Sequence, residues 1–156
     1  MFNWENIKNK AGLLYDDASK KIKQYTPESF SKEKKFVNSL VISLSLMTMA
    51  DKKAEKEEIE ASINILKDID EIKELDMIQE ALELYELHIN SLSVALASDI
   101  KWTMTIAKLL SECSKVKDYP QYVVMIQNLL NYIANSDGNF DDSEKEMKQK
   151  ILDSLK

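Results

Sequence analysis

The chain has 156 residues, a formal net charge of −6, one cysteine, one histidine, two glycines, two prolines and no arginine. This length fits a single domain over residues 1–156 with a sizeable core, and the scarcity of glycine and proline favours long helices with short connections over all-β folds. The single cysteine excludes an intramolecular disulfide and fits a reducing cytoplasm, and an acidic chain without arginine is a poor binder of nucleic acid, whose phosphates need basic contacts.

The first predicted element is an amphipathic helix within residues 1–25. Thr26-Pro27 ends it, because the residue before a proline is pushed out of the α region. The helix either packs on the core or docks on a partner helix or an anionic membrane surface, with Trp4, Ile7 and Leu14 as its contact residues. We expect it to be separable from the rest of the chain. Its apolar stripe recurs at steps of three and four residues and comprises Trp4, Ile7, Ala11, Leu14, Ala18, Ile22 and Tyr25.

Six further helices are predicted from the apolar spacing, over residues 31–50, 55–68, 73–89, 90–113, 120–136 and 141–155. The first of these is apolar on nearly every face, which is typical of a central, buried helix. The sequence therefore predicts an all-α fold of about seven helices without a sheet. Its longest apolar run, residues 40–50, is far shorter than the roughly 20 residues of a membrane span, so any membrane contact would be peripheral.

Two acidic turns share one pattern, in which an Asp is followed by an apolar residue, a second acid and then a Glu. The matched pairs are Asp51 with Asp137, Ala54 with Phe140, Glu55 with Asp141, and Glu58 with Glu144. Apolar residues on both sides of the turns match as well, which predicts that Leu44 and Ile133 are core residues on the helices ahead of the two turns. This internal repeat predicts two helix–acidic turn–helix units related by pseudo-two-fold packing. Lys52 stands where the second copy has Gly138, and only glycine adopts a left-handed turn without cost.

Six acids of these turns are candidate ligands for a weakly bound divalent cation: Asp51, Glu55, Glu58, Asp137, Asp141 and Glu144. Oxygen ligands at this spacing suit calcium or magnesium, and zinc is a third candidate. The spacing is not that of an EF-hand, since Asp142 and Lys148 replace the glycine and the bidentate glutamate of that loop. Pseudo-symmetry could bring the two turns together as one cation-responsive surface.

A structural interpretation of the same acids stands beside the metal site. Acidic residues before and within the first turn of a helix satisfy its unpaired N–H groups and favour its dipole. Asp141 followed by Glu144 three residues later has the form of a capping box. On this interpretation the acids stabilise the turns and bind nothing.

The remaining chemically reactive side chains give little sign of catalysis. His88 is the only histidine and borders an apolar helical face, and zinc sites of the usual kinds need a second histidine or cysteine ligand nearby. Cys113 lies on an apolar stripe and is interpreted as a core thiol. With two glycines, the chain has no glycine-rich loop for phosphate.

The second acidic turn carries a resemblance. An apolar helix that ends in Ser136-Asp137-Gly138, followed by acids and a second helix with Glu144 in its first turn, resembles the TerB family of tellurite-resistance proteins. The resemblance covers nearly the whole chain, although residues 70–120 match only in helical pattern and Lys52 departs from the family's usual glycine. It implies a TerB-like helical bundle.

The resemblance also implies a function. It indicates a non-enzymatic cytoplasmic protein of a tellurite-resistance or stress-response system, acting at the inner face of the membrane. Its implied partners are other Ter proteins, namely a TerC-like membrane protein and a TerD-like calcium-binding protein. Two alternatives remain open: an enzyme that acts on tellurite or another oxyanion, and a TerB-like domain recruited to an unrelated complex.

Overall fold

The computed structural model describes residues 30–136 and 140–156, and the predicted helix of residues 1–25, with Trp4, Ile7 and Leu14, lies outside this range, as does Asp137. Within the described residues the fold is all-α, with seven α-helices and no strand, which confirms the predicted class. The helices are α2 (Lys32–Thr48), α3 (Lys56–Asp68), α4 (Asp70–Glu74), α5 (Ile78–Ala95), α6 (Asp99–Cys113), α7 (Pro120–Ser136) and α8 (Asp142–Ser154), with a short 3-10 turn, η3 (Ser114–Val116), after α6.

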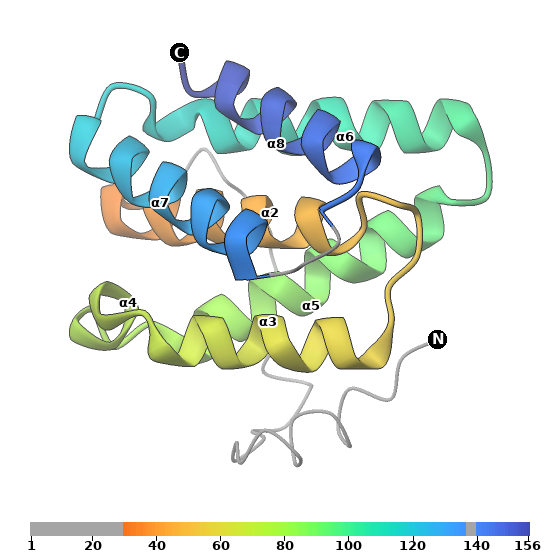
Figure 1. Ribbon diagram of the computed structural model, residues 1–156. Helices are drawn as coiled ribbons and strands as arrows, with labels where there is room; N and C mark the ends of the chain where they lie inside the picture. The colour runs from red at the N-terminus through yellow and green to blue at the C-terminus, as the bar shows by residue number, and fades with distance from the viewer. Residues whose placement is uncertain (1–29, 137–139) are drawn as a thin grey trace.

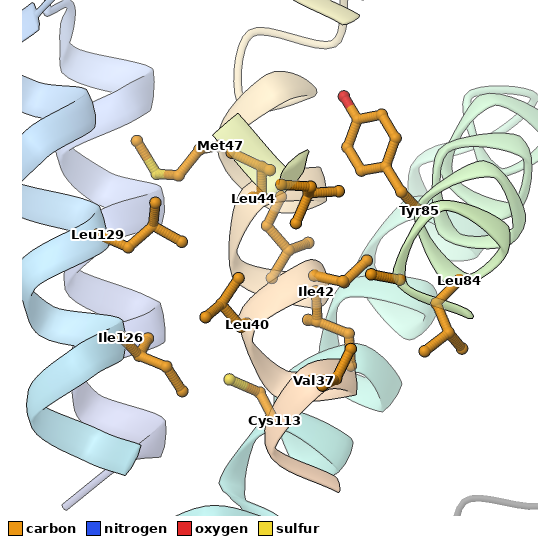
Figure 2. Packing of buried hydrophobic residues seen from close by; sticks show 14 of the residues in the cluster. Val37, Leu40, Ile42, Leu44, Met47, Leu84, Tyr85, Cys113, Ile126 and Leu129 are labelled. Carbon is orange, nitrogen blue, oxygen red and sulfur yellow. The ribbon is translucent and has the colours of Figure 1, made fainter. Parts of the chain in front are cut away.

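Helix α2 is the centre of the fold. It packs against α3, α5, α6, α7 and α8, which surround it (Figure 1). In Figure 2 the side chains of Leu40 and Leu44 lie between Ile126 and Leu129 of α7 on one side and Tyr85 of α5 on the other. Every residue from Phe36 to Met49 is buried, as the apolar composition of this segment predicts.

The hydroxyl residues of α2 are buried without leaving their polar atoms unpaired. Ser43 donates a hydrogen bond to the carbonyl of Ser39 at 2.9 Å, and Ser45 donates to that of Val41 at 2.8 Å. Such bonds to the preceding turn satisfy a hydroxyl inside a helix without an outside partner.

The predicted boundary between residues 89 and 90 is wrong. Helix α5 continues to Ala95, and α6 begins only after Ser98, whose side chain accepts a hydrogen bond from the Lys101 amide at 3.1 Å. Leu92 and Ala95 are buried, and their packing stabilises α5 across a polar stretch whose local sequence suggests the end of a helix. The predicted start at residue 73 is also wrong, because the short α4 precedes a separate α5.

These shifted boundaries change which apolar side chains are buried. Leu75 follows α4 and is exposed, and Leu96 follows α5 with 41% of its surface accessible. Ile100, in the first turn of α6, is 72% exposed. None of the helices in residues 30–136 and 140–156 combines the length and apolar character that crossing a membrane requires.

The first acidic turn adopts a left-handed conformation at Lys52, although no glycine stands there. Lys52 has φ 63°, in the region that glycine enters freely and other residues enter at a cost. Its side chain makes exposed contacts only, an ion pair with Asp99 at 3.8 Å and an approach to the Trp102 ring at 5.7 Å. Exposed contacts of this kind are individually weak.

Replacing Lys52 with glycine is therefore expected to raise the free energy of unfolding by about 0.5–1 kcal/mol, since relief of the left-handed strain outweighs the lost surface contacts. Chemical denaturation measures the change. Lys53→Gly is the matched control, because Lys53 is not among the described residues with positive φ, and it should be neutral or destabilising. Equal changes in the free energy of unfolding for Lys52→Gly and Lys53→Gly would contradict backbone strain at Lys52.

Candidate functional site

A cavity of about 360 Å³ lies where the two helix–turn–helix units meet. Its floor consists of buried residues, its walls are half-buried and apolar, and four acidic side chains line it as well. The complete lining is Leu44, Met47, Thr48, Asp51, Glu57, Glu58, Ala61, Ser62, Ile65, Ile133 and Glu144. Helices α2, α3, α7 and α8 all contribute, so the cavity joins segments from both copies of the repeat.

The structure brings together three of the six predicted site residues. Asp51 and Glu58 of the first unit and Glu144 of the second line this one cavity. Glu55 and Asp141 do not line it, because both occupy the position immediately before a helix. The two turns therefore approach each other, as expected, at the cavity that Asp51, Glu58 and Glu144 line.

Local hydrogen bonds explain why some acids of the two turns cap a helix or close a turn, whereas others line the cavity. The Asp141 side chain accepts from the Glu144 amide at 2.9 Å and so caps α8, as predicted. Asp51 accepts from the Lys53 amide at 3.0 Å, which closes the first turn. Glu55 begins α3 without a side-chain capping bond. The structural interpretation thus holds for Asp141 and in part for Asp51, whereas Glu58 and Glu144 line the cavity.

A chain of hydroxyl groups lies at the floor of the cavity. Thr48 Oγ1 is 3.1 Å from Ser62 Oγ and 3.1 Å from Tyr85 Oη, and all three side chains are buried. Burial, with a smaller contribution from the negative charge of Glu58, raises the pKa of Tyr85 to about 12. The tyrosine therefore keeps its proton, and this hydroxyl chain links α2, α3 and α5 beneath the cavity.

Sequence reasoning missed the non-acidic part of this lining. Thr48 and Ser62 were not singled out, although their hydroxyls lie on apolar helical faces, where a polar residue needs a partner. Glu57 was overlooked because the repeat gives it no acidic counterpart. Ile133 was predicted to be a core residue, yet it is half-buried, as is Ile65, because one side of each faces the cavity.

Within the described part of the chain, no three histidine, cysteine or acidic side chains are grouped so that they could hold one metal ion. Asp137 lies outside that part of the chain. The divalent-cation site over the six acids stays a prediction.

The only histidine belongs to a buried polar network away from this cavity. His88 Nε2 lies 2.8 Å from Asn38 Oδ1, and Asn38 Nδ2 donates to Glu112 Oε1 at 3.4 Å. Burial lowers the pKa of His88 to about 3, and the positive charge of Lys108 contributes. The ring is therefore neutral near pH 7, so it donates through Nε2 to the amide oxygen. This network ties α2 to α5 and α6.

Cys113 is a core thiol, as the sequence indicates. It is fully buried, with its sulfur 3.6 Å from Ser43 Oγ and 3.7 Å from the Ser39 carbonyl oxygen. Burial raises the pKa of the thiol to about 11. Since the thiolate is the nucleophile, this cysteine is poorly reactive near neutral pH.

Comparison of the chain with protein-family models, with curated proteins and with solved structures gives no match.

Proposed function

We propose that this protein is a non-enzymatic, TerB-like interaction module whose acidic cavity responds to cations. The observation that carries the proposal is the lining of one cavity by Asp51 and Glu58 from the first unit and Glu144 from the second. Acidic side chains that share a site repel one another, and a bound cation relieves that repulsion. Binding at this point is coupled to the relative placement of α3 and α8.

The rest of the lining favours a ligand that is partly apolar. Leu44, Met47, Ile65 and Ile133 give the cavity an apolar floor and walls beneath the acids. A lysine side chain fits both parts, since its alkyl stem packs on apolar surface while its ammonium group meets the acids. Because no three of the described acids are grouped to hold one ion, a divalent cation at the same entrance would contact one or two of them and keep most of its water shell. Oxyanions are disfavoured there because the acidic side chains repel them.

The biological setting proposed here rests on the TerB resemblance. The protein would act in the cytoplasm, at the inner face of the membrane, within a tellurite-resistance or stress-response system. Its partners would be a TerC-like membrane protein and a TerD-like calcium-binding protein, with a cation modulating the contact. The strongly acidic stretch from residue 51 to residue 86, which holds 13 acids and five lysines, suits a basic surface on such a partner.

A titration followed by NMR tests the cation response. Calcium, magnesium and zinc are added separately to the full chain, and shifts are expected for residues around Glu58 and Glu144. In a Glu58→Gln/Glu144→Gln variant the affinity should fall about tenfold or more, because each lost charge–charge contact contributes on the order of 1 kcal/mol.

The matched control is Glu71→Gln/Glu74→Gln, which removes two exposed acids of α4 outside the cavity. It changes the net charge equally and should leave the response intact. Equal weakening by both double variants would show a nonspecific charge effect and contradict the site. If none of the three cations shifts the NMR signals of the unaltered chain, cation binding is no part of the protein's function.

A further inference from the structure

The acidic cavity continues into a second one, and together they form a groove. The second cavity, of about 580 Å³, is lined by Ala61, Asn64, Ile65, Asp68, Ile69, Leu129 and Tyr132. Ala61 and Ile65 line both cavities. The combined depression, called here the α3–α7 groove, follows α3 from Glu57 to Ile69, with α7 contributing its opposite wall.

The α3–α7 groove has the chemistry of a site for an amphipathic helix. Apolar side chains line it along its length, from Ile133 through Ile65 to Leu129. Acids occur at both of its ends, with Glu58 at one and Asp68 at the other. An apolar groove with charged edges receives the apolar stripe of a helix and selects the opposite charge on its polar face.

We propose that the α3–α7 groove is the docking site of the chain's own segment 2–25, held there by its apolar stripe and its lysines. Residues 1–25 hold five lysines and three acids, whereas the chain as a whole carries a net charge of −6. The stripe through Leu14 and Ile22 supplies apolar contacts at helical spacing. The inference rests on the proposed function, because the groove includes the acidic cavity and the lysines of the segment would meet the acids of that cavity.

Length and direction are compatible with this placement. Helix α3 has 13 residues, so the groove is roughly 20 Å long and takes about 13 residues of a docked helix. Helix α3 runs back along α2 (Figure 1), so the end of the groove at Ile69 lies towards the start of α2. The described chain enters at Phe30 just before α2. Residues 22–25 would then meet the Ile69 end, and residues nearer Leu14 would meet the acidic cavity.

A second apolar surface competes for the same segment. Val94, Ile100 and Met104, from the end of α5 and the first turns of α6, are 59%, 72% and 68% exposed. Lys101 and Lys108 are exposed on this same helix α6, against one exposed acid, Asp99, which pairs with Lys52. Their positive charge disfavours a lysine-rich helix, whereas the acids of the α3–α7 groove favour it. Charge complementarity therefore selects the groove.

Thiol crosslinking in the full chain tests the docking. Ser19→Cys is combined with Asn64→Cys in the groove or, as the matched control, with Met104→Cys on the competing surface; Asn64 and Met104 are both exposed. Cys113 should not react with the crosslinker, because burial raises the pKa of its thiol to about 11. A short bismaleimide should join Ser19→Cys to Asn64→Cys within one molecule about tenfold faster than to Met104→Cys. Adding Ile22→Glu should abolish that preference.

Three results would overturn the proposal: equal rates for the two pairs, faster reaction of the Met104→Cys pair, or crosslinks only between molecules. The last would assign the groove to the segment of a second copy. The cation titration is read separately. A failed crosslink with an intact cation response refutes the docking and leaves the proposed function, whereas an efficient crosslink without a cation response removes the cation from the proposed function and leaves the docking.

Discussion

Replacing Leu44 with alanine is expected to lower the free energy of unfolding by about 2–5 kcal/mol. The side chain is 2% exposed on the central helix and lies between α7 and α5 (Figure 2). Truncation removes its dispersion contacts and leaves a void that the surrounding helices fill only in part. Because Leu44 also borders the acidic cavity, the loss should fall in the lower half of this range. Urea denaturation monitored by circular dichroism measures it.

Three matched substitutions calibrate that result. Leu40→Ala, on the same helix and equally buried but outside the cavity, should be at least as destabilising as Leu44→Ala. Ile133→Ala should be milder, since Ile133 is half-buried rather than the full core residue that the repeat predicts. Val124→Ala, at a site 51% exposed, should change stability by no more than about 0.5 kcal/mol. A loss at Leu44 as small as that at Val124 would contradict the central placement of α2.

Acidification is expected to destabilise the protein through His88. Burial lowers the pKa of His88 to about 3 from the ordinary 6.5, so between these values the unfolded chain binds a proton that the folded chain does not. This contribution to stability is fully present above pH 6.5 and is lost as the pH falls towards 3, at about 1.4 kcal/mol per pH unit. Between pH 7 and pH 5 the loss should be about 2 kcal/mol.

The variant His88→Gln isolates this effect. Glutamine keeps a side-chain donor for Asn38 but binds no proton in this pH range, while the acidic residues titrate alike in both proteins. Unfolding free energies at pH 7 and pH 5 should therefore fall more steeply for the original chain. Parallel losses in the two proteins would show that His88 is accessible to protons in the folded state.

Periodicity and local signals predicted much of the helical framework. The apolar run around Leu40 identified the buried central helix, and Pro120 and Asp141 marked the starts of α7 and α8 as the structure has them. The boundary at residue 90 failed because tertiary burial of Leu92 continued α5 beyond a locally unfavourable stretch. The competing signal was Ser98, whose capping bond begins α6.

The candidate site was predictable only where the repeat defined it. Matching Glu58 to Glu144 anticipated two acids at one place, and the cavity contains both. The repeat could not separate acids that cap a helix, such as Asp141, from acids that line a cavity, because that depends on neighbouring helices distant in sequence. For the same reason, it gave no indication that Ser62 and Thr48 lie hydrogen-bonded at the cavity floor.

The central claim is that the two acidic turns form a single site, and a double-mutant cycle on calcium binding tests it most directly. Calcium affinity is measured by calorimetry for the original chain, Glu58→Gln, Glu144→Gln and the double variant. Because both acids line one cavity, their effects should be non-additive, with a coupling free energy of about 0.5–3 kcal/mol. Additive effects, or no calcium binding by the original chain, would contradict a shared site.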